Sequence, residues 1–340
     1  MKALMKLALG DGNMDLQDMP IPSVTQNKVK IEVAYVGVCG SDLKIRKGQM
    51  ATDPPVIVGH EFSGTIVEVG QGVTNFKVGD RVVSETAGII CGACEYCMSG
   101  NYLMCPSRRS LGYKENGAFA KYVIARQDML HRIPDSVSFE EAAVTEPAAV
   151  AFHAVYDYAR LLPTSNVLIS GPGTLGILVA QMAKTATKNV VVCGLAQDAH
   201  RLEILKNMGV KVVFSDQENM KEFANQYTGG IGFDVAFDCT GAPPAISTDM
   251  DCLKNSGTLV QVGIPHQTIT ADYGLIPMKE LTIKGVYGSK YSNWTSVLKM
   301  VEEHQVDLKS MVTSIYSLDE WEKAYETAAD PKQVKVLVKP

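Results

Sequence analysis

Two patterns of hydrophobic and polar positions divide the chain near residue 150. In the first part, apolar residues alternate with polar ones over short runs rich in β-branched side chains, most clearly in 28–38. Alternation with a period of two is typical of strands that bury one face. Further short strands are expected at 64–69 and 81–83, so this part is predicted to be mostly β.

The second part combines short apolar runs with segments of helical spacing, such as 175–184 and 200–208. The expected strands are 167–170, 190–193, 211–214, 233–238, 258–263 and 281–286. Strands that alternate with helices pair in parallel. The pattern therefore predicts an α/β fold with a doubly wound, six-stranded parallel sheet.

The segment that joins the two parts, 140–158, is rich in alanine and helical in period, with Pro147 as an interruption. Beyond about 290 the strand–helix rhythm ends. Amphipathic helices are expected at 294–303 and 318–328, and a closing strand at 334–338.

A chain of 340 residues is too long for one small core, so two domains are expected. We expect the last segment to rejoin the first part. The predicted domains are 1–150 together with 290–340, and 151–289.

The composition is that of a folded, soluble protein. The chain is 46% hydrophobic and 20% charged, and its net charge of −5 argues against a nucleic acid or an anionic membrane as partner. No apolar run has the length of a membrane span. Lys2 stands where a signal peptide would be apolar, which predicts a cytoplasmic protein. Eight cysteines, four of them close together, suit metal binding in a reducing compartment.

A glycine-rich loop follows the strand expected at 167–170. Gly171, Gly173 and Gly176 fit the pattern G-x-G-x-x-G, and Thr174 and Leu175 complete the loop. The glycines allow a tight turn and a close approach of backbone to a pyrophosphate, which then sits at a helix N-terminus. Because this loop lies between a strand and an alanine- and leucine-rich helix, it predicts a dinucleotide site.

An acid that holds the ribose 2′-hydroxyl is expected at the end of the second strand of such a fold. Gly194 stands there, and Asp198 follows four residues later. A 2′-phosphate is then no longer repelled, and Arg201 or His200 is placed to meet it; alternatively, Asp198 reaches back or a backbone group suffices. The choice between NAD and NADP stays open.

Four cysteines in a short loop, Cys91, Cys94, Cys97 and Cys105, can close a tetrahedron around Zn²⁺. All four positions would come from the protein, which indicates a structural site. Two disulfides or free thiols are the alternatives. A redox pair fits poorly, because the Cys-x-x-Cys motif repeats within a glycine-containing loop.

His60 and Glu61 lie within the run Gly59-His-Glu-Phe-Ser-Gly64. A histidine beside a glutamate is weak evidence alone, but Cys39 lies upstream and Glu146 downstream. One thiol, one imidazole and one carboxylate suit a catalytic Zn²⁺ whose fourth position is open to water or substrate. The other histidines, to which no metal role is assigned, are His131, His153, His200, His266 and His304.

With these motifs in register, the whole chain resembles the zinc-containing medium-chain dehydrogenase/reductase, or alcohol dehydrogenase, family. The stretch from Glu146-Pro147 to His153 is most similar to its sorbitol and threonine dehydrogenase branch, in which a Glu replaces a Cys ligand. The resemblance implies a GroES-like catalytic domain, a Rossmann domain, and homodimers or homotetramers.

Carried over by position, the resemblance implies that Cys39, His60 and Glu146 bind catalytic zinc. Glu61 would hydrogen-bond the metal-bound water or enter the coordination sphere transiently, and Ser41 would be the first proton acceptor. The structural zinc would bind Cys91, Cys94, Cys97 and Cys105, which makes two zinc ions per subunit. Many relatives carry a histidine three residues after this serine, and this chain has Lys44.

The expected activity is zinc-dependent hydride transfer from a secondary alcohol of a polyol, or of its phosphate, to NAD(P)⁺. The alternatives are an amino-alcohol oxidation like that of L-threonine 3-dehydrogenase and a non-catalytic nucleotide-binding protein. A nucleic-acid binder built on the four cysteines is opposed by the acidic charge. Arg108 and Arg109 are surface charges or, in a sharper interpretation, recognise a substrate phosphate.

Overall fold

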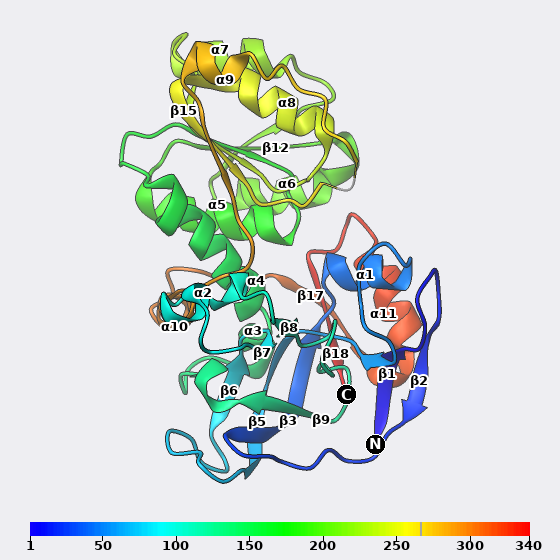
Figure 1. Ribbon diagram of the computed structural model, residues 1–340. Coiled ribbons are helices and arrows are strands. Elements are labelled where there is room, and N and C mark those ends of the chain that lie inside the picture. Colours follow the sequence, from blue (N-terminus) through cyan, green and yellow to red (C-terminus); the bar gives the residue numbers. More distant parts are fainter. Residues whose placement is uncertain (266) are drawn as a thin grey trace. The chain divides into compact units, whose positions relative to one another are not determined.

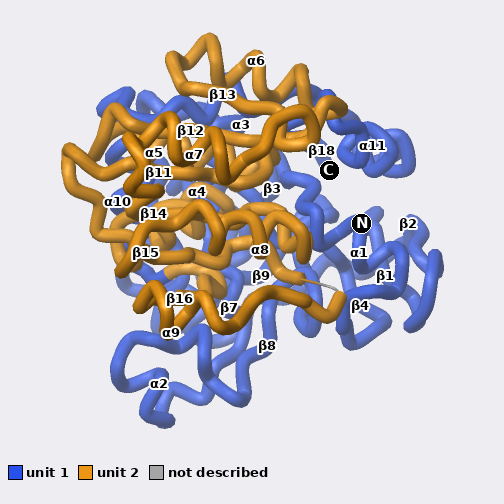
Figure 2. Tube along the Cα trace, turned by 90° about the horizontal axis from the view of Figure 1, so that it is seen from above, with its two compact units in different colours: residues 1–146, 290–340 blue, residues 147–289 orange. Residues whose placement is uncertain are grey.

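The computed structural model describes residues 1–265 and 267–340. The chain forms two compact units (Figures 1 and 2): unit 1 is Met1–Glu146 with Lys290–Pro340, and unit 2 is Pro147–Ser289. The border that the sequence places at residue 150 falls inside helix α4 (Thr145–Phe152). His266 lies outside the described residues.

Unit 1 is built on a seven-stranded sheet in the order β10-β6-β5-β3-β18-β17, with β9 also paired to β3. In the same order these strands are Leu130–Arg132, Arg81–Ser84, Glu61–Val69, Lys28–Gly37, Lys335–Lys339, Val312–Ser317 and, for β9, Tyr122–Arg126. The last strand of the chain, β18, pairs antiparallel with β3 in the middle of the sheet. The C-terminal segment is therefore an integral part of unit 1.

Smaller elements complete this unit. A three-stranded sheet has the order β2-β1-β4 and a two-stranded one joins β7 and β8. Their bounds are Met14–Asp18, Lys2–Lys6, Val56–Ile57, Ala87–Ile89 and Arg109–Ser110. The helices are α1 (Gly40–Arg46), α2 (Glu95–Met98), η1 (Tyr102–Met104), η2 (Gln127–Met129), α3 (Phe139–Ala142), α10 (Tyr291–Glu302), η5 (Leu318–Glu320) and α11 (Trp321–Ala328).

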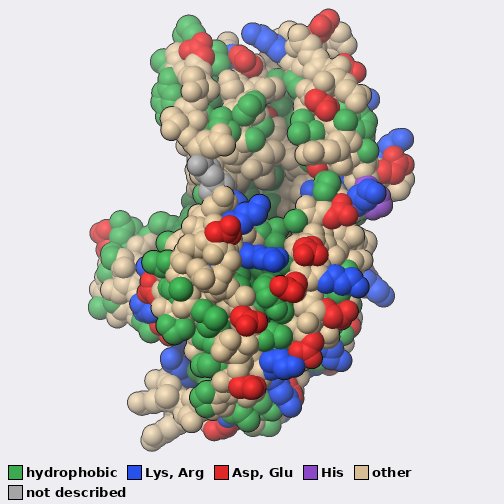
Figure 3. Space-filling model, turned by 90° about the vertical axis from the view of Figure 1, so that its right-hand side faces the viewer, with side chains coloured by type: hydrophobic (Ala, Val, Ile, Leu, Met, Phe, Trp, Pro, Cys, Tyr) green, Lys and Arg blue, Asp and Glu red, His purple; other side chains and the backbone are tan. Residues whose placement is uncertain are grey.

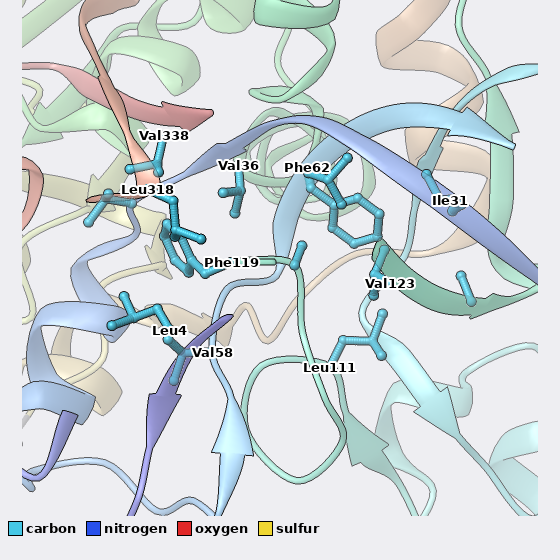
Figure 4. Close-up of a cluster of buried hydrophobic side chains, with 14 of the residues drawn as sticks. Leu4, Ile31, Val36, Val58, Phe62, Leu111, Phe119, Val123, Leu318 and Val338 are labelled. Atoms are coloured by element: carbon cyan, nitrogen blue, oxygen red, sulfur yellow. The ribbon is translucent and has the colours of Figure 1, made fainter. Parts of the chain in front are cut away.

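The core of unit 1 gathers side chains from both ends of the chain. Leu4, Phe119 and Val338 are fully buried and lie in one cluster (Figure 4). Phe119 also decides the backbone beside it. A Cβ atom on Gly59 would lie 2.4 Å from the Phe119 ring, and Gly59 has a φ of +92°, so only glycine fits there. The core thus determines the course of the chain just before His60.

Unit 2 confirms the predicted α/β fold. Its six strands are parallel, in the order β13-β12-β11-β14-β15-β16. Strand β11, the first of them in the sequence, lies near the centre of the sheet. The strand bounds in that order are Lys211–Phe214, Val190–Gly194, Val167–Ser170, Phe233–Asp238, Leu253–Gln261 and Thr282–Gly285. This order, with its reversal at the first strand, is that of a Rossmann fold.

Helices cover both faces of this sheet (Figure 1). Helices α5 (Thr174–Ala186) and α6 (Ala199–Asn207) pack on one face, against β11, β12 and β13. Helices α7 (Met220–Thr228), α8 (Pro243–Cys252) and α9 (Leu275–Lys279) share a hydrophobic cluster with residues of the sheet. Because helices cover both faces of these strands, the strand sequences are unbroken runs of apolar residues.

The segment 140–158 differs from its prediction. Pro147 does not interrupt a helix there; it lies in the first turn of α4, where its missing N–H costs no hydrogen bond. The break comes earlier, after α3, and the helix continues beyond α4 as a π-helical segment, η3 (His153–Ala159). Alanine spacing alone does not distinguish these forms.

Candidate metal and cofactor sites

Three of the residues singled out in the sequence meet in unit 1. Cys39 is the N-cap of α1, His60 comes directly before β5, and Glu61 begins that strand. One ligand atom from each lies within 4.8 Å of the others. His60 and Glu61 are buried, and Cys39 is partly buried. The antiparallel pairing of β3 with β5 produces this meeting, because it sets Gly37, near Cys39, opposite Glu61.

Asp42 lies behind two of these ligands. Its Oδ2 accepts a hydrogen bond from the backbone N–H of Cys39 at 2.9 Å, and its Oδ1 lies 3.9 Å from Nδ1 of His60. A buried carboxylate behind one imidazole nitrogen leaves the other nitrogen for a metal. Burial lowers the pKa of His60, but Asp42 and then Cys39 raise it to about 10. The surroundings thus favour a positive charge at this point.

Glu61 is held by a cation from the far end of the chain. Its Oε2 accepts from Nζ of Lys335 at 2.6 Å, and both side chains are almost completely buried. Glu61 therefore pairs with a buried lysine. Its Oε1 is buried without a hydrogen-bond partner among the described residues. That oxygen remains available to a metal or to metal-bound water.

Glu146 lies outside the close set of three. It stands in the first turn of α4, and the group of mutually close ligand atoms consists of Cys39, His60 and Glu61. Glu146 is nevertheless within electrostatic reach: burial raises its pKa, His60 lowers it and Glu61 raises it, to about 7. The structure therefore brings two carboxylates to this region, and Glu61 is the nearer one.

A pair of hydroxyl groups borders the same site. Tyr113 donates to Oγ of Ser41 at 2.8 Å, and Ser41 lies 3.5 Å from Nε2 of His60. The Tyr113 ring also packs on the His60 ring, with centroids 5.0 Å apart. Burial, and next the charge of Cys39, raises the pKa of Tyr113 well above its usual value. The sequence alone does not indicate a role for Tyr113, because no motif near it points to a catalytic or binding function.

The four cysteines of the loop lie together as predicted from their spacing. Their Sγ atoms are all within 4.8 Å of one another, with Cys91 3.9 Å from Cys97 and 3.6 Å from Cys105. A tetrahedron with Zn–S bonds of about 2.3 Å has S···S edges of about 3.8 Å. A disulfide needs about 2.0 Å. The spacing fits a metal and excludes disulfides in this structure.

The glycine loop of unit 2 has the geometry that its sequence predicts. Gly171 has a φ of +95°, and a Cβ on Gly176 would lie 1.8 Å from the Gly171 carbonyl oxygen. No heavy atom among the described residues lies within 4 Å of a Cβ placed on Gly173, the N-cap of α5. Thr174 and Leu175 begin that helix. The loop can therefore approach a pyrophosphate closely at a helix N-terminus.

The chain matches two family descriptions and covers its relatives from end to end. Residues 25–135 match the alcohol dehydrogenase GroES-like domain, and residues 174–303 match zinc-binding dehydrogenase. It is 42% identical to a sorbitol dehydrogenase of Halalkalibacterium halodurans, over 100% of this chain and 99% of the relative.

It is also 36% identical to D-arabitol-phosphate dehydrogenase of Enterococcus avium, over 99% of this chain and 97% of that one. The chain belongs to the zinc-containing alcohol dehydrogenase family. A solved structure of a zinc-binding dehydrogenase of Sinorhizobium meliloti 1021 bound to NADP has a TM-score of 0.93 at 26% identity, covering 100% of this chain and 99% of that one.

The ligand groups of this dehydrogenase fit the zinc ions of its family. The four-thiol cluster offers a complete tetrahedral set, which suits a structural ion. The buried cluster offers sulfur, nitrogen and oxygen, with Glu61 Oε1 unsatisfied. Fewer close protein ligands suit an ion that also binds a substrate.

Two arginines beside the cysteine loop are already engaged. Arg109 donates to Glu115 at 2.6 Å and to Asp53 at 3.0 Å. Arg108 donates to Thr86 at 2.9 Å. Arg109 is thus neutralised by two carboxylates, which weakens its interpretation as a phosphate ligand.

No helix in the described part of the chain has the length and apolar character that crossing a membrane requires.

Replacing Lys335 with Met should lower the free energy of unfolding by about 3–5 kcal/mol, because Glu61 would be left as an uncompensated buried charge. Adding Glu61→Gln should recover part of the loss, since residue 61 then carries no charge that needs a partner. Denaturant unfolding after zinc is removed with a chelator measures both, because a zinc ion beside Glu61 would itself compensate the charge. Lys339→Met, an exposed lysine on the same strand, is the control. Equal losses in the single and double variants would contradict the pairing.

Proposed function

We propose that this dehydrogenase oxidises a secondary alcohol of a polyol, or of a polyol phosphate, to the ketone. It is a zinc-type, NAD(P)-dependent alcohol dehydrogenase by family. The observation that carries the proposal is the buried meeting of Cys39, His60 and a carboxylate next to the hydroxyls of Ser41 and Tyr113. A hydroxyl substrate needs both a cation and a proton acceptor, and this site combines them.

Each residue has a proposed part in the reaction. Cys39 and His60, with Glu61 or Glu146, would hold zinc, which when bound stabilises the alkoxide form of an alcohol. A bound nicotinamide would supply the hydride acceptor. Ser41 Oγ would take the hydroxyl proton and release its own to Tyr113, 2.8 Å away, whose proton would in turn leave to water at its partly exposed side chain. The Asp42 carboxylate lies 3.9 Å from Nδ1 of His60 and favours its positive charge.

The substrate class follows from chemistry and relatives together. The relatives named above act on sorbitol and on an arabitol phosphate, as their names state. Arg109 is occupied by carboxylates. Lys44, half-buried, lies close enough to Cys39 for that thiol to raise its pKa, although burial has the larger, lowering effect. Because it lies close to Cys39, Lys44 is a candidate to meet a substrate phosphate. Oxidation of L-threonine is the second candidate.

The distribution of charged side chains on the surface supports a dissolved small molecule as the partner. Acidic and basic side chains are interspersed on the face shown in Figure 3, and the net charge is −5. This distribution does not favour nucleic acid. The free cysteines of the described residues suit a reducing compartment, which supports a cytoplasmic location.

An edge of unit 2 supports a homodimer or homotetramer. Strand β16 ends the parallel sheet and is mostly exposed. Ile283 on it is 43% exposed, and Tyr287 just beyond it 55%. An unpaired strand edge with apolar side chains is suited to pair with its copy.

Turnover and metal content test the function. Sorbitol, other free polyols, polyol phosphates and L-threonine are each offered with NAD⁺ and with NADP⁺, and the absorbance of reduced nicotinamide is followed. A polyol or its phosphate should be oxidised. His60→Ala should abolish turnover and lose one of two zinc ions, whereas Cys97→Ser should lose the other. Full zinc content with retained turnover in His60→Ala would refute the site, and threonine as the best substrate would favour the second candidate.

Replacing Tyr113 with Phe tests the proton path. The ring packing on His60 is kept, but the partner of Ser41 Oγ is lost. Turnover should fall by about tenfold or more, since positioned proton transfer contributes about 10²–10⁴-fold. Zinc content and cofactor affinity should be unchanged. An unchanged turnover number would show that the proton leaves by another route.

Light scattering tests the assembly. Ile283→Asp places a charge on the exposed edge strand and should convert the oligomer into smaller species. Ile231→Asp, another exposed apolar position of unit 2 at 69%, should leave the mass unchanged. A wild-type protein that is monomeric at micromolar concentration would end the proposal.

A further inference from the structure

The last position of β12 cannot carry the acid that normally recognises the ribose. Gly194 ends that strand. A Cβ placed on Gly194 would lie 2.8 Å from Cγ and Cδ of Pro172, which belongs to the glycine loop. A proline ring cannot move aside as a long side chain can. The side chain that holds a ribose hydroxyl must therefore come from elsewhere in this chain.

Asp198 brings a carboxylate to the same place. Its Oδ2 lies 3.3 Å from the point where the Cβ of residue 194 would be. The same oxygen accepts from the backbone N–H of Leu195 at 3.0 Å, which holds it in position. The short turn η4 (Ala196–Asp198) places this carboxylate, because it brings Asp198 back beside Leu195, the residue that follows β12.

A second carboxylate occupies the neighbouring amide. Asp216, just after β13, accepts from the N–H of Ala196 with both oxygens, at 3.0 and 3.1 Å. The first two amide groups after β12 are therefore both bound to carboxylates. Arg201, the cation that could attract a phosphate, has its Nη1 3.7 Å from Asp198 Oδ1.

We propose that Asp198 replaces the missing acid and that Asp198 and Asp216 together make this dehydrogenase select NAD over NADP. A carboxylate accepts a hydrogen bond from a ribose 2′-hydroxyl. A 2′-phosphate would meet two negative charges, which repel it, and would find the nearest amide donors already taken. Membership of the family does not decide the matter, because the solved relative named above is bound to NADP. The inference rests on the proposed function, since it requires a nicotinamide cofactor.

Binding to the zinc-loaded protein tests the proposal without turnover. Dissociation constants of NADH and NADPH are measured by fluorescence, and those of 5′-AMP and adenosine 2′,5′-bisphosphate by calorimetry. The wild type should bind NADH at least about tenfold more tightly than NADPH. Asp198→Asn with Asp216→Asn should shift that ratio toward NADPH by about tenfold or more. Glu203→Gln, which removes an exposed acid on α6, should leave the ratio unchanged.

The outcomes separate the possible roles. A wild type that binds NADPH as tightly as NADH overturns the proposal whether or not the variants fold. Equal weakening of both cofactors in the double variant would show that the carboxylates only shape the turn, and would also overturn it. If neither reduced nucleotide binds the wild type, the proposed function fails together with this inference.

Discussion

The excess of acidic groups around His60 is the constraint on which unit 1 depends. Asp42, Glu61 and Glu146 surround one imidazole and one buried ammonium, that of Lys335. Removing so many carboxylates from water is costly unless cations accompany them. Lys335 neutralises one of them, and His60 is held in surroundings that favour positive charge. A divalent metal ion would offset the remaining negative charge, which is why this cluster suits zinc.

The hydrophobic core and this charged site depend on the same structural elements. Strand β18 contributes Val338 to the core and Lys335 to the site, and its pairing with β3 determines both. The Phe119 ring leaves room only for a glycine at position 59, and the turn at this glycine determines the position of His60. A change in core packing would therefore move a metal ligand as well as lower stability.

The two clusters of metal ligands differ in the way that their chemistry requires. The cysteine loop supplies four thiols from one stretch of chain, and a fully ligated ion has no place for a substrate. The buried cluster draws on distant segments and offers sulfur, nitrogen and oxygen. Its neighbours Ser41 and Tyr113 add hydroxyl groups that can move a proton. A metal ion with four protein ligands can stabilise a loop, whereas an ion with fewer protein ligands can also take part in a reaction.

The sequence by itself determined the features that depend on neighbours in the chain: the six strands of the parallel sheet, the glycine loop, the four-cysteine spacing, and the pair His60-Glu61. Local periodicity and steric rules are enough for these. Only the tertiary structure decided that Lys335, 274 positions away, pairs with Glu61, that Tyr113 joins Ser41, and that Glu61 lies nearer the cluster than Glu146. It also placed Asp198 where Gly194 leaves no acid. Contacts between distant segments follow from strand pairing and packing, and neither can be inferred from spacing along a single sequence.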